Sequence, residues 1–285
     1  MKKIILVLAV LLLGVANVSY AKTKHHKKHA THVVKSTKSK RHNPTYTDTR
    51  ANVLLLNVTD NYLIDGNYES SKLSIASISK LMTIYTVLKA NQNPMEVLTI
   101  TEKSINHTRL RKGMELTRYD LIRLSLIHSD NMAALTLSQN YPGGQEAFIK
   151  QMNANAKELQ MFDTIFFEPT GLNPYNSSTL HDVSLLTSAA STYDTFRDAA
   201  QSESVTVHAR SGNKIITIKA GPTINMFGKE GVITIKTGFT NAAGWCVTML
   251  VNSDNKLYNL VILGARSKNE RKYIIEKSLK TIASV

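Results

Sequence analysis

An apolar run at residues 81–88 constrains the fold more than any other stretch of the chain. If the run is a helix, nearly its whole circumference is apolar. A helix with this pattern belongs in the core of a domain. The run is preceded by Ser77-Ile78-Ser79-Lys80. If the run is helical, Ser77 lies at its N-terminal end and Lys80 lies one turn further on, on the same face.

This pairing of a hydroxyl with an amine is one way to activate serine without histidine. A buried lysine near a second cation loses its proton more readily than a free lysine, and the helix N-terminus favours negative charge beside Ser77. The Ser-x-x-Lys spacing starts at Ser19, Ser77, Ser211 and Ser253, and only the copy at Ser77 opens a buried helix. Ser77 is therefore a candidate nucleophile, with Lys80 as its candidate base.

The first 46 residues predict two segments outside the folded domain. Residues 1–21 carry two lysines, an uncharged apolar stretch and small residues at the cleavage position, which is typical of a secretory signal peptide. Residues 22–46 are basic and rich in histidine. So polar a segment buries too little apolar surface to fold, which predicts a disordered tail. We expect an exported protein that is soluble after signal cleavage.

Much of the formal net charge of +14 comes from this tail, so the folded body is only mildly basic. The tail is interpreted either as a solvated tether or as a segment that adheres to an anionic envelope polymer or membrane surface. Its histidines at positions 25, 26, 29 and 32 have no fixed geometry, so they are weak evidence for a metal site.

Residues 47–285 are long enough for one large domain, and no linker rich in Pro, Gly or Ser divides them. Cys246 is the only cysteine, which excludes an internal disulfide. The stability of the domain must therefore come from its core.

The order of patterns along this domain predicts its class. Two β-rich segments at 51–58 and 62–64 predict a hairpin. Residues 81–200 are mainly helical in pattern, residues 204–264 form short β-rich runs, and an amphipathic helix is expected at 269–282. This order indicates an α+β fold with one antiparallel sheet and helices packed on it.

A second polar cluster, Ser129-Asp130-Asn131, is flanked on both sides by apolar helical residues. Three polar side chains are unfavourable there unless they have partners or bind a substrate. Helix capping by Ser129 or Asp130 is the structural alternative.

A third cluster, Lys236-Thr237-Gly238, ends a strand-like run and occurs once in the chain. Lys236 offers a charge to a carboxylate, Thr237 offers a hydroxyl, and Gly238 lets a backbone approach a ligand closely. An ordinary turn is the alternative.

Ser-x-x-Lys, Ser-x-Asn and Lys-Thr-Gly, in this order on a helix, a helical loop and a strand, form the motif set of serine penicillin-recognising enzymes. With the sequences at 76–83, 167–172, 178–182 and 236–244, the chain resembles the D-alanyl-D-alanine carboxypeptidase family of low-molecular-mass penicillin-binding proteins. The resemblance implies a serine β-lactamase and penicillin-binding-protein-like transpeptidase fold, in which an antiparallel sheet is flanked by helices and carries a mainly helical insert. It also implies a penicillin-binding peptidase domain at 47–285 in the periplasm of a bacterial cell envelope.

Within the family, the chain is similar to the short soluble D-alanyl-D-alanine endopeptidases, which act on peptidoglycan cross-links. It stops soon after its last helix, and Ser129-Asp130-Asn131 replaces the Ser-Gly-Asn of anchored carboxypeptidases. The main alternative is a D-alanyl-D-alanine carboxypeptidase that trims stem peptides.

Two other functions remain as alternatives. The segment that starts at Glu168 is similar to the deacylating-glutamate loop of class A β-lactamases, but Asn173 lies one place too far along, so Glu168 is interpreted as a structural loop residue. A wall-binding protein with an inactive site, acting through its basic tail, is the non-enzymatic alternative.

The resemblance implies a role for each motif residue. Ser77 attacks the carbonyl of a D-alanyl bond in a peptidoglycan stem peptide, Lys80 takes its proton, and Ser129 passes a proton to the departing amine. β-Lactams are the implied covalent inhibitors. We expect no metal, no organic cofactor and no nucleic-acid partner.

The same resemblance assigns the substrate contacts. Asn131 would hold the peptide, while Lys236, Thr237 and Gly238 would bind the carboxylate next to the scissile bond. The backbone N–H groups of Ser77 and Phe239 would form the oxyanion hole.

Overall fold

The computed structural model describes residues 51–67, 71–103, 105–226, 228–229 and 231–285; the predicted signal peptide and basic tail lie outside these residues. The strands are β1 (Asn52–Asn57), β2 (Tyr62–Gly66), β3 (Leu73–Ser74), β4 (Val97–Thr99), β5 (Met114–Thr117), β6 (Ser177–Ser178), β7 (Val205–Ser211), β8 (Lys214–Ala220), β9 (Val232–Thr240), β10 (Gly244–Ser253) and β11 (Lys256–Ala265). The helical segments are η1 (Ala76–Ile78), α2 (Ser79–Lys89), α3 (Arg118–Arg123), η2 (Leu124–His128), α4 (Asn131–Gln139), α5 (Gly144–Glu158), α6 (Leu180–Ala190), α7 (Asp194–Ala200) and α8 (Lys268–Ile282).

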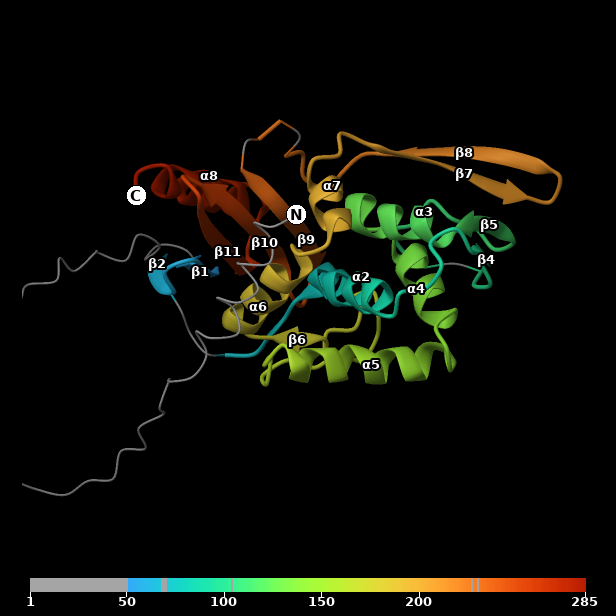
Figure 1. The fold of residues 1–285 in the computed structure, drawn as a ribbon, viewed down its shortest axis with the longest axis horizontal. Coiled ribbons are helices and arrows are strands. Elements are labelled where there is room, and N and C mark those ends of the chain that lie inside the picture. The colour runs from blue at the N-terminus through green and yellow to red at the C-terminus, as the bar shows by residue number, and fades with distance from the viewer. Residues whose placement is uncertain (1–50, 68–70, 104, 227, 230) are drawn as a thin grey trace, which may run out of the picture.

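A five-stranded antiparallel sheet in the order β2-β1-β11-β10-β9 forms one half of the molecule (Figure 1). Val53 and Leu55 of β1 belong to the core cluster beneath α8, whereas Leu54 between them belongs to the core on the helical side. Because α8 covers one face and α6 the other, β10 and β11 are buried on both faces. This burial explains their nearly continuous apolar sequences.

The predicted central helix is α2, which packs against α4, α5 and α6. Leu81, Met82 and Ile84 are completely buried. The predicted N-terminal hairpin is confirmed as β1 and β2, and the predicted C-terminal helix is confirmed as α8. None of the helices in the described part of the chain is long and apolar enough to cross a bilayer.

The prediction of a single sheet is wrong for β7 and β8. They form a second antiparallel sheet in the order β4-β5-β7-β8, at the far end of the helical half (Figure 1). Side chains of β7 alternate between buried and exposed, as expected for a sheet with one solvated face. The partners β4 and β5 have three and four residues, which is too short for a strand pattern to be recognised in the sequence.

Replacing Ile84 by alanine tests the central position of α2. Ile84 has no exposed surface, so Ile84→Ala leaves a cavity and is expected to lower the free energy of unfolding by about 2–5 kcal/mol. Urea denaturation measures the loss. Leu88→Ala, at a half-buried position of the same helix, is the control and should cost less; equal losses would contradict burial of the helix at Ile84.

Candidate active site

Ser77 lies in the short turn η1, immediately before α2. The Lys80 Nζ donates a hydrogen bond to the Ser77 Oγ over 2.8 Å. The predicted spacing therefore brings the two side chains together on one face of the helix start. Ser77 is partly exposed, whereas Lys80 is completely buried, so the hydroxyl is the more accessible member of the pair.

Three oxygen acceptors surround the buried Lys80 amine. Its Nζ lies 2.8 Å from the Ser77 Oγ, 2.7 Å from the Asn131 Oδ1 and 2.6 Å from the Thr170 carbonyl oxygen. Burial lowers the pKa of Lys80 to about 7, although the negative charges of Glu168 and Asp130 raise it. At neutral pH a large share of Lys80 is therefore uncharged and able to accept a proton.

Lys236 brings a second buried amine into the same site. Its Nζ donates to the Ser129 Oγ over 2.8 Å and to the Thr237 carbonyl over 2.9 Å. Burial holds the pKa of Lys236 well below its ordinary value, and the positive charges of Lys80 and Arg271 lower it further. All three sequence motifs thus converge on one pair of amines.

The backbone around Ser129 explains how three polar residues fit between apolar ones. The chain widens into the π-helical turn η2, and Ser129 then adopts a left-handed conformation with φ of 60°. The Asp130 carboxylate accepts hydrogen bonds from the backbone N–H groups of Ala133 and Arg109, at 3.0 and 2.8 Å. The Asp130 side chain therefore caps the helix, while the side chains of Ser129 and Asn131 contact the amines of Lys236 and Lys80.

Gly238 allows β9 to pack directly against the turn that carries Ser77. A Cβ atom at Gly238 would lie 2.9 Å from the Ser77 nitrogen and 3.0 Å from the Ala76 Cβ. Phe239, which follows it, is 46% exposed and stacks on Trp245 with ring centroids 4.1 Å apart. The two segments predicted to supply the oxyanion hole are therefore in contact. The Thr237 hydroxyl donates to the Thr223 hydroxyl over 2.6 Å.

The loop at 166–176 contributes an atom that motif analysis missed. The Thr170 carbonyl oxygen accepts hydrogen bonds from Lys80 and, at 3.4 Å, from the Ser77 Oγ. The Glu168 carboxylate accepts from the backbone N–H groups of Thr170 and Gly171, each at 2.6 Å, so its geometry is that of a structural loop residue. A backbone carbonyl has no side-chain signature. The sequence marked this loop through the family resemblance at 167–172 and the turn-rich composition around Pro169, but it did not indicate the carbonyl.

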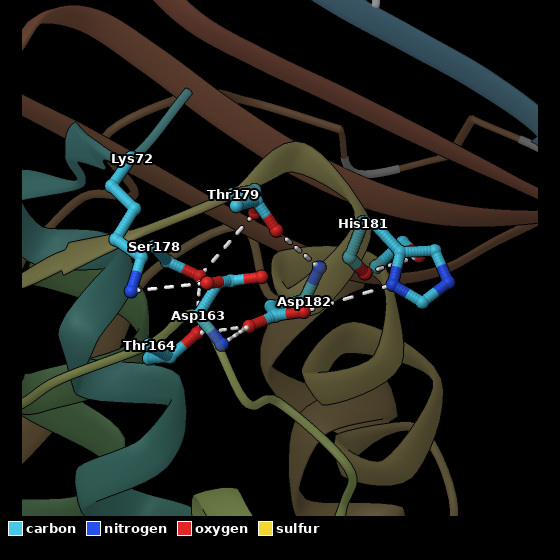
Figure 2. Close-up of polar contacts among 8 residues, drawn as sticks. Lys72, Asp163, Thr164, Ser178, Thr179, His181 and Asp182 are labelled. Carbon is cyan, nitrogen blue, oxygen red and sulfur yellow. Dashed lines mark hydrogen bonds and ion pairs between the residues drawn. The ribbon is translucent and has the colours of Figure 1, made fainter. Parts of the chain in front are cut away.

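A polar cluster at the start of α6 anchors this loop (Figure 2). The Asp182 carboxylate accepts from the Asp163 backbone N–H at 2.9 Å and from the Thr164 hydroxyl at 2.8 Å. The hydroxyls of Thr164 and Ser178 are 2.7 Å apart. His181 lies on the opposite side of Asp182 from Ser178 (Figure 2), so these residues do not form a Ser-His-Asp relay.

Metal ligation has no basis in the described part of the chain. Among these residues no group of three or more His, Cys, Asp or Glu side chains could hold an ion. The Cys246 thiol is buried, and burial raises its pKa to about 11, which makes it a poor nucleophile at neutral pH.

Gly171 provides a test of how the loop is held. It has φ of +83°, and a Cβ there would lie 1.9 Å from the Ala76 carbonyl oxygen and 2.8 Å from the Ser77 nitrogen. Gly171→Ala is expected to displace the Thr170 carbonyl, lower stability by about 1–3 kcal/mol and slow labelling of Ser77 by a fluorescent penicillin. Gly113→Ala is the matched control, because Gly113 has φ of +84° with no atom within 4 Å of its Cβ position. Equal labelling of both variants would contradict the role of the close contact.

Comparison with known proteins identifies a family with these motifs. The family described as D-alanyl-D-alanine carboxypeptidase, peptidase S11, matches residues 16–267. The D-alanyl-D-alanine endopeptidase of Escherichia coli (strain K12) is 36% identical over 222 residues, which are 75% of this chain and 71% of that protein. A D-alanyl-D-alanine endopeptidase of Pseudomonas aeruginosa is 37% identical over 199 residues, 68% of this chain and 64% of that protein.

The fold is similar to that of penicillin-binding protein D2 from Listeria monocytogenes, solved in its ampicillin-bound form. The TM-score is 0.72 at 27% identity, and the match covers 84% of this chain and 99% of that chain. This likeness confirms the predicted α+β, penicillin-binding-protein-like fold. With a family match over most of its length, this chain belongs to the D-alanyl-D-alanine carboxypeptidase family, peptidase S11.

Proposed function

We propose that this chain is a serine D-alanyl-D-alanine endopeptidase that hydrolyses the peptide cross-links of peptidoglycan. The observation that carries the proposal is the 2.8 Å contact between the Ser77 Oγ and the Lys80 Nζ, together with the pKa of about 7 for this buried amine. A neutral amine at that distance is able to take the hydroxyl proton as the oxygen attacks a carbonyl.

The first half of the reaction forms an acyl-enzyme. The Ser77 Oγ bonds to the carbonyl carbon of the D-alanyl residue while its proton moves to Lys80. The backbone N–H groups of Ser77 and Phe239 stabilise the negative charge on the carbonyl oxygen. The C–N bond then breaks, and Ser129, hydrogen-bonded to Lys236, gives its proton to the leaving amine and receives the proton held by Lys80, which becomes neutral again.

The second half releases the product by hydrolysis. Water gives a proton to the neutral Lys80 and attacks the ester carbonyl. The bond between the carbonyl carbon and the Ser77 oxygen then breaks, and this oxygen takes the proton from Lys80, which restores the free enzyme. Asn131 holds the peptide through its amide, while Lys236, Thr237 and Gly238 border the position of the carboxylate beside the scissile bond. Because the Glu168 carboxylate is engaged by its own loop, rapid hydrolysis of a penicilloyl ester is not expected.

Cleavage of cross-links is favoured by the names of the relatives in Escherichia coli and Pseudomonas aeruginosa, both endopeptidases. The family description favours a second candidate function, removal of terminal D-alanine by a carboxypeptidase. The ampicillin-bound state of the Listeria protein supports acylation of Ser77 by β-lactams.

The N-terminal sequence supports a cellular context for this activity. We infer that residues 1–21 direct export to the periplasm and are removed there, and that residues 22–46 form a basic tail attached to the peptidase domain at 47–285. The tail acts either as a solvated tether or as an electrostatic contact with the anionic envelope.

Purified protein incubated with cross-linked and uncross-linked muropeptides tests the proposed activity, with products identified by mass. Cross-linked dimers should be converted to monomers, and Ser77→Ala should reduce this rate by about a thousandfold or more. Ser253→Ala, at another Ser-x-x-Lys copy, is the control and should remain active.

Each alternative function predicts a different result in this experiment or in a measurement of wall binding. Release of D-alanine from uncross-linked peptides with intact dimers would establish the carboxypeptidase instead. Continued cleavage by Ser77→Ala would refute the assignment of the nucleophile. Loss of wall binding on deletion of residues 22–41, without an effect of Ser77→Ala on function, would support the inactive wall-binding protein.

The pH dependence of acylation tests the role of Lys80. Only its uncharged form accepts a proton, so the rate of penicillin labelling should rise with pH through about 7, the pKa of Lys80, and level off above it. Labelling rates measured across this range give the midpoint. Lys80→Arg, which stays protonated, should be labelled very slowly at every pH; a flat profile for the unaltered protein would contradict the assignment.

A further inference from the structure

Four cationic side chains lie near one another at one end of the molecule. Arg109, Arg111, Lys112 and Lys214 are exposed, and none of them forms an ion pair with a described residue. Six other cations of the helical half are paired with carboxylates: Lys89, Arg118, Arg123, Lys150, Arg197 and Arg210. Lys103, Lys157 and Lys219 of this half also form no ion pair with a described residue, but each lies apart from the other two in the sequence.

These four side chains come from two segments that lie at the same end of the strands of the second sheet. Residues 105–113 precede β5, and Lys214 begins β8. Met114 of β5 pairs with Ser211 of β7, and Ser211 in turn pairs with Lys214. The β7–β8 turn and the start of β5 therefore lie at the same end of the molecule (Figure 1).

The same loop borders the candidate active site. The Asn131 side-chain amide donates to the Asn106 carbonyl over 2.6 Å, and the Arg109 backbone N–H donates to Asp130 over 2.8 Å. Asn106 and Lys112 are six residues apart, at most about 20 Å. A chain molecule held beside Asn131 is thus within reach of the cationic group.

The positive charge of this group is not neutralised locally. The sequence has no acidic residue from 103 to 114, and Glu115 is engaged by Arg210. Exposed charges of one sign attract counter-charges within a Debye length, about 10 Å at 0.1 M salt. Guanidinium groups also bind carboxylates through paired hydrogen bonds.

We propose that Arg109, Arg111, Lys112 and Lys214 form a docking surface for carboxylates of the peptidoglycan stem peptides that neighbour the one held in the cleft. The inference rests on the proposed function, because that function brings a polymer with repeated carboxylates to Asn131. Contact at two places on one polymer strengthens binding without any change at the cleft. Single soluble stem peptides gain nothing from this surface.

Sedimentation with purified peptidoglycan sacculi tests this surface separately from catalysis. In full-length Ser77→Ala protein, the added substitutions Arg111→Gln, Lys112→Gln and Lys214→Gln should weaken binding about tenfold at low salt, and the difference should disappear near 1 M salt, where the Debye length is about 3 Å. The matched control carries Lys157→Gln, Lys229→Gln and Lys280→Gln, which remove the same charge from other exposed positions. It should bind like the parent.

The same three substitutions are also made in protein that keeps Ser77, and labelling by fluorescent penicillin then checks that the cleft is intact. The labelling rate of this variant should stay within about twofold of that of the unaltered protein. The proposal is overturned if the control weakens binding equally, or if the loss persists at high salt. It is also overturned if the loss occurs only with sacculi that retain covalently attached phosphate polymers, because the surface would then bind phosphate. Failure of the unaltered protein to cleave muropeptide dimers would reject the proposed function, while the sedimentation result would stand.

Discussion

Two lysine amines buried in one cleft are the constraint on which the rest of the site depends. Removing an ammonium group from water is costly unless it finds hydrogen-bond acceptors or gives up its proton. Lys80 does both, because three oxygens surround its Nζ and its pKa falls to about 7. The positive charge of Lys80 lowers the pKa of Lys236, in addition to the larger effect of burial. The same desolvation that disfavours the charged amine gives Lys80 the lowered pKa that its proposed role as a base requires.

The acceptors come from segments that are far apart in the chain. Thr170 lies 90 residues from Lys80, and Asn131 lies 51 residues from it. Glu168 fixes the backbone that carries the Thr170 carbonyl, and Asp130 fixes the backbone beside Asn131. Structural carboxylates next to the cleft thus hold the atoms that contact the amine. They also raise the pKa of Lys80, so that its proton affinity is a balance between burial and nearby negative charge.

The sequence predicted the parts of the site that depend on local spacing. Ser77 and Lys80 share a face because they are one helical turn apart, and the apolar run after them becomes the buried helix α2. The interpretation of Ser129-Asp130-Asn131 as either a cap or part of a site was incomplete, since Asp130 caps α4 while its neighbours reach the amines. The prediction of a single sheet was wrong because β4 and β5 are too short to be recognised in the sequence, although β5 pairs with β7 and thereby places β7 and β8 in a separate sheet.

Local patterns are therefore sufficient to predict the class of fold, the central helix and the three motifs. Hydrophobic periodicity and short-range geometry depend only on residues that are close together in the sequence. The contact of Gly238 with the turn of Ser77, the Thr170 carbonyl on Lys80 and the placement of β7 and β8 in a sheet of their own with β4 and β5 depended on tertiary structure. Each joins residues distant in the chain, and two involve backbone atoms, which are the same in every amino acid. The pKa of Lys80 belongs to this second group, because burial is a property of the folded domain.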